Sequence, residues 1–390
     1  MIKNIVVFGS TGSIGKTLLS LIKNNKIIRI KLLTCDKNIN LLLKQAKLFN
    51  VRNLIITNKS KFKKAQNSKE FKLFNIYNDF SNLEKILKNK VDYVMNSIVG
   101  FDGLKPTLEI IRYTRFLAIA NKESIICGWS LIKKKILQHN VKIIPVDSEH
   151  YSIKSLINYS SNSNNKEIDQ IILTASGGPL YNTSIRKFNK ISISDATNHP
   201  NWKMGKKISI DSATLVNKVF EVIEAQRLFD VDIKNIHIKI HSKSYVHSII
   251  KFKNGLIKIC AHKPNMIIPI AGSLDIFFDK FHFPNKINFK ILNNLKLKDP
   301  NKNKFIALNI LKNYKNYCSL YDTALVSCND TLVTLFLLKK IKFNQISINL
   351  NKILKSKKIV KLKDKVPQNY DEVKKIHDYV RLKTINLCIE

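Results

Sequence analysis

The densest group of chemically capable residues is the segment NHPNWKMGKKISIDSATLVNK at 198–218, with Glu221 just beyond it. It carries an imidazole, an indole, hydroxyls, an amide and ammonium groups. Ser212 is a favourable N-cap, and the apolar spacing after it predicts a helix over residues 213–229. A helix start with free N–H groups, a serine and a lysine is a natural anion site. The alternative is a capped amphipathic helix with a solvated face.

Two carboxylates, Asp147 and Glu149, follow an apolar run at residues 142–146. In an extended chain their side chains point to the same side. Adjacent carboxylates repel each other unless a cation or a shared proton relieves them. Mg²⁺ typically takes one or two carboxylates together with substrate and water oxygens. The pair therefore predicts a divalent-metal site, with two exposed loop acids as the alternative.

Two glycine-rich segments allow the backbone to approach a phosphate. GSTGSIG at 9–15 joins an apolar run to a predicted helix, which is the context of a dinucleotide pyrophosphate turn. The alternative is a tight turn without a ligand. Asp36, Lys37 and Asn38 follow the next apolar run, where such a fold contacts the adenosine ribose. Farther on, Ser176-Gly177-Gly178 follows a predicted strand, and Ser176 could donate to an anion.

The elements that position these groups predict an α/β fold. Alternating strands and helices over residues 1–146 predict a doubly wound, Rossmann-like parallel sheet that binds a dinucleotide. Residues 147–278 are predicted to form a central α+β catalytic and connective domain with the metal site. Residues 279–303 have little periodicity and are predicted to be a linker. Helical spacing over residues 304–390 predicts a C-terminal helical bundle.

Composition restricts the function classes. The net charge of +39 suggests nucleic-acid binding, but only 7 of the 67 basic residues are arginine and the lysines are spread along the chain. We interpret this charge as drift toward A+T-rich codons. No apolar run reaches the length of a membrane span. The strand pattern begins at Ile2, so no signal peptide is expected. Six scattered cysteines without C-x-x-C spacing favour the reducing cytoplasm.

The motifs GSTGSIG, NKES, PVDSEH, SGGP, HPNWKMG and DSATLVNK, with Glu221 after the last, occur in this order. Together they resemble the 1-deoxy-D-xylulose 5-phosphate reductoisomerase family, from Ile2 to the last predicted helix. The resemblance implies NADPH-dependent rearrangement and reduction of that sugar phosphate to 2-C-methyl-D-erythritol 4-phosphate, a step of non-mevalonate isoprenoid precursor biosynthesis. It also implies Mg²⁺ or Mn²⁺ and a cytoplasmic homodimer, without specific nucleic-acid or membrane partners.

Two alternatives remain at this point. Another NAD(P)-dependent dehydrogenase would explain the first 150 residues, but not the carboxylates or the Ser, Asn and Lys set after them. A basic nucleic-acid-binding protein on an α/β scaffold would explain only the charge.

The resemblance also implies roles for individual residues. The metal ligands would be Asp147, Glu149 and Glu221. The cofactor would contact Thr11, Gly12, Ser13, Ile14, Lys37, Asn38, Asn121, Glu123 and Gly205. The substrate would contact Lys122, Ser148, Glu149, Ser176, His199, Trp202, Ser212, Asn217 and Lys218. Within this set, the phosphate would be held by Ser176, Ser212, Asn217 and Lys218. A flap over the substrate would carry Trp202 and Met204.

The chain departs from the family pattern in three places. Ser242-Lys243 stands where the family usually has Pro-Gln, and Cys260-Ala261-His262 stands where it usually has Gln-Leu-Gly. Because this region is connected with subunit contact and the shape of the site, the resemblance implies an altered interface there. The third departure is Asp36, which replaces a family glycine.

Overall fold

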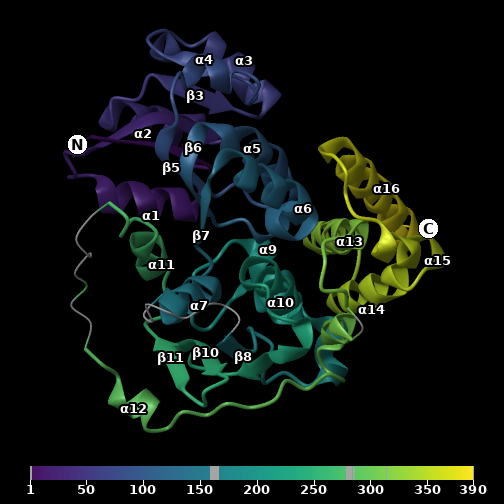
Figure 1. The fold of residues 1–390 in the computed structure, drawn as a ribbon. Helices are drawn as coiled ribbons and strands as arrows, with labels where there is room; N and C mark the ends of the chain where they lie inside the picture. Colours follow the sequence, from purple (N-terminus) through teal and green to yellow (C-terminus); the bar gives the residue numbers. More distant parts are fainter. Residues whose placement is uncertain (1, 159–166, 278–282, 284–285, 313, 390) are drawn as a thin grey trace. The chain divides into compact units, whose positions relative to one another are not determined.

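A computed structural model describes the 390-residue chain except residues 1, 159–166, 278–282, 284–285, 313 and 390 (Figure 1). The chain forms two compact units. The first unit consists of residues 1–124, 131–147 and 266–283. The second consists of residues 125–130, 148–265 and 284–390.

The first unit contains a parallel sheet of seven strands in the order β4-β3-β2-β1-β5-β6-β7. Its strands are β1 (Lys3–Phe8), β2 (Ile28–Cys35), β3 (Asn53–Ile56), β4 (Asn75–Tyr77), β5 (Val91–Asn96), β6 (Thr114–Ile119) and β7 (Lys142–Pro145). The strand order reverses between β1 and β5, which is the switch point where such sheets bind ligands. The predicted doubly wound sheet is therefore confirmed.

Apolar side chains on the strands of this sheet pack against helices in one core that includes Val7, Leu18, Leu42 and Ile270. The helices that contribute to this core are α1 (Ser13–Ile22), α2 (Ile39–Leu48), α3 (Lys59–Gln66) and α11 (Ile267–Gly272). The unit also contains α4 (Leu83–Ile86), α5 (Leu104–Ile110) and both ends of α6 (Lys122–His139). We did not predict α3, because Ala65 is its only buried residue and no apolar stripe marks it.

The second unit is built around a sheet of four strands in the order β11-β10-β8-β9. The strands are β8 (Ile168–Ala175), β9 (Ile236–Ile240), β10 (Val246–Phe252) and β11 (Ile257–Ala261). Asn254-Gly255 turns β10 into β11 as predicted, with Gly255 at φ 87°. Ile171 and Leu173 of β8 share a core with Ile153, Val222 and Phe229 from two helices.

The helices of the second unit confirm a helical C-terminal region. They are α7 (Ser148–Asn158), α8 (Ile193–Thr197), α9 (Lys206–Thr214), α10 (Val216–Phe229), α12 (Phe289–Leu292), α13 (Leu320–Leu337), α14 (Phe343–Leu354), α15 (Lys357–Val360) and α16 (Tyr370–Ile389). Arg227 of α10 donates to Asp322 of α13 at 2.9 Å. This buried ion pair fastens the C-terminal helices to the helix that carries Lys218 and Glu221.

Short 3-10 helices connect these elements in both units. They are η1 (Lys69–Phe71), η2 (Phe101–Gly103), η3 (Ile111–Tyr113), η5 (Ile185–Lys190), η6 (Ile233–Asn235), η7 (Ile306–Leu311) and η8 (Lys361–Asp364).

The predicted helix over 213–229 with Ser212 as its N-cap is wrong. Helix α9 begins at Lys206 with Gly205 as its N-cap, and Ser212 lies in its last turn. Leu215 then adopts the left-handed conformation at φ 57° and separates α9 from α10. The apolar spacing concealed this break because Leu215 is itself buried. Its burial offsets the backbone strain of a non-glycine residue in that conformation, about 1–2 kcal/mol.

The predicted extended conformation around Asp147 and Glu149 is also wrong. Strand β7 ends at Pro145 and helix α7 begins at Ser148, so Glu149 lies in the first helical turn. An acidic residue is favoured there because the helix dipole is positive at its N-terminus.

All six cysteines are free. Among the described residues, no helix is both long and apolar enough to cross a membrane. The predicted domain limits at 146, 278 and 303 stay predictions, and residues 279–282 and 284–285 of the predicted linker lie outside the described part of the chain.

Candidate active site

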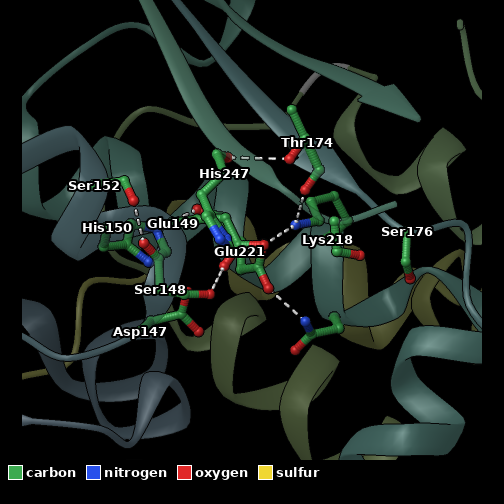
Figure 2. A network of polar contacts seen from close by, with 12 residues as sticks. Asp147, Ser148, Glu149, His150, Ser152, Thr174, Ser176, Lys218, Glu221 and His247 are labelled. Carbon is green, nitrogen blue, oxygen red and sulfur yellow. Dashed lines mark hydrogen bonds and ion pairs between the residues drawn. The ribbon is translucent and has the colours of Figure 1, made fainter. Parts of the chain in front are cut away.

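Lys218 is the centre of the polar network in the second unit (Figure 2). Its Nζ donates to Glu149 Oε1 at 2.8 Å, to the Thr174 carbonyl at 2.6 Å and to Glu221. Burial acts to lower the pKa of Lys218, but Glu149 and Glu221 more than offset it, so the pKa is raised. The ammonium is therefore charged and uses its three N–H bonds on α7, α10 and β8.

Glu149 and Glu221 present the oxygen atoms that a hard cation prefers. One carboxylate oxygen of each lies within 4.8 Å of the other. Ser148 Oγ donates to Glu149, and Asn217 Nδ2 donates to Glu221. The Lys218 ammonium stands between them as a cation would. Because the two carboxylates bind the Lys218 ammonium, they also suit Mg²⁺, which coordinates carboxylate oxygen.

Asp147, the third predicted metal ligand, is the last residue of the first unit and directly precedes Ser148 in the chain. There it forms an ion pair with Lys122 Nζ at 2.7 Å, and both side chains are at least 85% buried. Lys122 begins helix α6, and Asp147 follows strand β7. The structure thus pairs a predicted substrate residue with a predicted metal ligand.

His150 was not predicted, although it follows directly on the carboxylates in PVDSEH. Its Nε2 donates to the backbone carbonyl of Glu221 at 2.9 Å, and its Nδ1 lies 3.3 Å from Glu224. The ring stacks on Phe229 with centroids 6.3 Å apart. His150 therefore fixes α7, which carries Glu149, against α10, which carries Glu221. A histidine adjacent to two carboxylates was the signal available in the sequence.

The loop after β8 approaches the last turn of α9 very closely. Gly178 has φ +72°, and a Cβ there would lie 2.5 Å from the Ser212 carbonyl oxygen. Only glycine fits this position, on grounds of both space and backbone conformation. The close approach brings the loop that carries Ser176 against the helix that carries Ser212, as expected of two residues that bind one anion.

His199 fixes the direction of the Ser176 hydroxyl. Its Nδ1 accepts from the backbone N–H groups of Asn201 and Trp202, at 3.1 and 3.0 Å. Burial lowers the pKa of His199 to about 4, so the ring is neutral at pH 7 and carries its proton on Nε2. Nε2 therefore donates to Ser176 Oγ at 2.9 Å. Gly178 N–H donates to the same oxygen at 3.0 Å. With both lone pairs engaged, Ser176 can only donate its proton.

The predicted flap residues lie between His199 and α9. Asn201 Nδ2 donates to the Ser242 carbonyl at 2.7 Å and to Ser244 Oγ at 2.9 Å. The Trp202 ring meets His247 edge-on with centroids 6.0 Å apart. Met204 is half-buried, and Gly205 has no atom within 4 Å of an added Cβ.

The glycine-rich turn of the first unit has the geometry of a pyrophosphate cradle. Gly9 has φ +72°, and a Cβ on Gly15 would lie 2.5 Å from Ser10 Cα. Helix α1 begins at Ser13 without a side-chain cap at Gly12. Its first N–H groups and its dipole are therefore directed at the turn that carries Thr11 to Ile14, an arrangement that suits a dinucleotide phosphate.

Residues predicted for the adenosine end follow β2. Asp36 accepts from Thr57 Oγ1 at 3.2 Å, and Lys37 Nζ lies 3.9 Å from Asp36, with both side chains exposed. Asn38 Oδ1 caps α2 by accepting from the Leu41 N–H at 3.1 Å.

Two further predicted cofactor residues lie at the N-terminus of α6, and both are buried. Asn121 accepts from the Ser124 N–H at 2.6 Å and donates to the carbonyls of Ile98 and Gly100. Its side chain therefore joins β6 to the loop after β5. Glu123 is the second residue of the helix.

A doubly wound sheet with a glycine-rich turn, and a buried carboxylate pair beside anion-binding hydroxyls, define a nucleotide-dependent oxidoreductase with a metal site. Family models for 1-deoxy-D-xylulose 5-phosphate reductoisomerase match residues 5–128, and models for its C-terminal domains match residues 143–229 and 262–383. The chain belongs to the 1-deoxy-D-xylulose 5-phosphate reductoisomerase family.

Individual relatives agree with this assignment over the full length. The reductoisomerase of Pelagibacter ubique is 49% identical over 99% of this chain and 100% of its own. That of Thermotoga maritima is 33% identical over 96% of this chain and 94% of its own. The Zymomonas mobilis enzyme, solved with NADPH, has 28% identity and a TM-score of 0.87 over 100% of this chain and 99% of its own.

A reductoisomerase solved with NADPH, fosmidomycin and magnesium has 28% identity and a TM-score of 0.89, over 99% of this chain and 98% of its own. These comparisons do not favour the alternative dehydrogenase or the nucleic-acid-binding protein.

The contacts of Ser176 and His199 predict that the two residues act as a unit. Ser176→Ala and His199→Ala should each raise KM for the sugar phosphate about 10- to 100-fold, the range for losing a hydrogen bond to a charged group. The double variant should lose far less than the product of the two effects, because His199 acts through the Ser176 hydroxyl. Steady-state kinetics measure this, with the exposed Ser184→Ala as control. If the increases in KM of the two single variants multiply in the double variant, His199 does not act through the Ser176 hydroxyl.

Proposed function

We propose that Asp147, Glu149 and Glu221 hold Mg²⁺ or Mn²⁺ in an enzyme that converts 1-deoxy-D-xylulose 5-phosphate to 2-C-methyl-D-erythritol 4-phosphate with NADPH. The observation that carries this assignment is the buried Lys218 ammonium between Glu149 and Glu221. The Lys218 ammonium neutralises both carboxylates, which shows that this pair binds positive charge. Asp147 directly precedes α7 in the chain and supplies the third carboxylate.

The metal, when bound, polarises the substrate carbonyl and an adjacent hydroxyl as a Lewis acid. Lys218, held between Glu149 and Glu221, supplies positive charge for the substrate phosphate. Ser212, Asn217 and Ser176 complete the phosphate site. Ser176 donates the proton that His199 and Gly178 direct outward.

Rearrangement precedes reduction in this proposal. Lys122, which forms an ion pair with Asp147, and Ser148, which lies between Asp147 and Glu149 in the chain, orient the substrate hydroxyls. Trp202 and Met204 cover the substrate, and the exclusion of water protects reactive species. NADPH supplies the hydride. It is held by Thr11, Gly12, Ser13, Ile14, Lys37, Asn38, Asn121, Glu123 and Gly205.

Replacement of one metal ligand tests the function and the metal site together. Absorbance at the nicotinamide band should fall when wild type meets the sugar phosphate, NADPH and Mg²⁺. Glu149→Gln should abolish this turnover while NADPH binding stays nearly intact, because different segments build the two sites. The exposed Glu167→Gln serves as control. Substantial activity of Glu149→Gln at saturating Mg²⁺ would refute the ligand assignment, and an inactive wild type would refute the function.

The residues at the adenosine end predict that NADPH is preferred over NADH, but by a smaller margin than in relatives with glycine at position 36. Asp36 lies 21 residues beyond Gly15, where an acid accepts from a ribose 2′-hydroxyl and repels a 2′-phosphate. Lys37 opposes this through a charge-assisted contact to that phosphate. Asp36→Gly should widen the preference and Lys37→Ala should shrink it. The kcat/KM values for NADPH and NADH decide the matter, and a wild type that prefers NADH would overturn it.

We propose a homodimer in the cytoplasm. Strand β11 is an edge strand on which Ile257 and Ile259 are 58% and 49% exposed. An exposed apolar edge invites pairing with another copy of the chain. Six free cysteines agree with a reducing compartment.

Charge on this edge should prevent the association. Ile259→Lys should shift the mass in solution from dimer to monomer, as measured by sedimentation velocity. Leu73→Lys, at a leucine of the first unit that is 88% exposed, should not. A dimer that persists in Ile259→Lys would exclude β11 as the interface.

A further inference from the structure

His262 and His247 form a stacked pair beneath the flap. Their ring centroids are 3.7 Å apart and the ring planes differ by 20°. His247 is 1% exposed and His262 is 8% exposed, so the rings are packed inside the second unit. His262 stands where the resemblance gives the family a glycine.

An irregularity in the sheet directs His247 toward this position. Val246 pairs with Ala261, whereas Ser248 pairs with Cys260, so the register shifts by one residue at His247. Such a bulge bends the strand and redirects the side chain of its extra residue. The backbone N–H of His262 donates to the Tyr245 carbonyl at 2.9 Å and holds the chain in place beyond the bulge.

Hydrogen bonds fix both rings. His247 Nε2 donates to the His262 carbonyl at 3.2 Å, and His262 Nδ1 donates to the Lys263 carbonyl at 2.8 Å. Burial is the main cause that lowers the pKa of both rings, to about 4 for His247. Two neutral rings stack without charge repulsion. In the described part of the chain, the hydrogen-bond partners of these ring nitrogens are backbone carbonyls. Each ring therefore contacts the other side chains mainly through its flat face.

Trp202 connects the stack to the flap. Its indole contacts the His247 ring edge-on, with ring centroids 6.0 Å apart. Edge-to-face and stacked aromatic contacts add stability beyond the area they bury. Trp202 in turn donates its backbone N–H to His199, which orients Ser176. A continuous series of contacts thus runs from His262 to the predicted phosphate donor.

We propose that His262 is a positioning residue for the flap, whose imidazole braces His247 so that Trp202 is held in place to cover the substrate. A glycine at this position would leave one face of His247 without a neighbour, so that the hydrogen bond to the carbonyl of residue 262 would hold the ring without a packing partner. The contact between His262 and His247 lowers the conformational entropy lost on substrate binding, because the Trp202 indole is ordered before the ligand binds. This inference rests on the proposed role of Trp202 as a flap residue.

The test uses Trp202 as a local reporter. Trp129→Phe leaves Trp202 as the only tryptophan, and its accessibility is measured by acrylamide quenching in the free protein. In this background His262→Ala removes the brace, and His262→Phe keeps a flat ring without the ring nitrogens. His237→Ala, at an exposed histidine of β9, is the matched control. Thermal unfolding is recorded for each variant, and His262→Gln replaces His262→Ala if the latter does not fold.

We expect His262→Ala to increase quenching of Trp202 and to raise KM for the sugar phosphate about three- to tenfold, as loss of an aromatic pair implies, with kcat nearly unchanged. His262→Phe should restore both properties to near wild type. Unchanged quenching in His262→Ala, or a His262→Phe variant as impaired as His262→Ala, would overturn the proposal. Because quenching needs no substrate, an inactive wild type would refute the proposed function without deciding this inference.

Discussion

The repulsion between two buried carboxylates is the constraint around which the second unit is arranged. Glu149 and Glu221 come from helices that are far apart in sequence, and neither could be buried as an isolated charge. Lys218 relieves the repulsion and also binds the Thr174 carbonyl, so that one ammonium joins α7, α10 and β8. His150 adds a second connection between the same helices. These contacts therefore hold the two proposed metal ligands close together.

The proposed phosphate-binding residues depend on two backbone positions in the left-handed conformation, of which Leu215 is strained and Gly178 adopts it without strain. Leu215 breaks one helix into two, which places Ser212 at the end of α9 and Asn217 at the start of α10. Gly178 then lets the β8 loop approach the Ser212 carbonyl. Strain of this kind persists only where surrounding packing determines it, and here buried leucine and close backbone contact supply that packing. The proposed phosphate site is thus built from residues at helix ends.

Sequence reasoning succeeded where a local pattern determines the structure. The apolar runs located the strands other than β4, and the glycine spacing at 9–15 located the tight turn between β1 and α1. It failed at Ser212 because the break at Leu215 leaves the apolar spacing intact. It failed at Asp147 and Glu149 because α7 begins at Ser148, directly after the strand, and places Glu149 in its first turn. His150, Thr174 and the His247–His262 stack were missed because their partners are set by long-range packing, which a single sequence does not reveal.

The fixed tautomer of His199 has a consequence for inhibitor chemistry. Because Ser176 can only donate, it selects ligand groups by hydrogen-bond polarity as well as by charge. A fully ionised phosphonate or sulfate head group presents lone pairs in every direction and would meet the hydroxyl favourably. An amide N–H, an ammonium or a protonated acid whose hydrogen points at Ser176 would place one hydrogen-bond donor against another, the Ser176 hydroxyl. For the proposed contact between Ser176 and the substrate phosphate, isosteres should therefore be groups that accept hydrogen bonds.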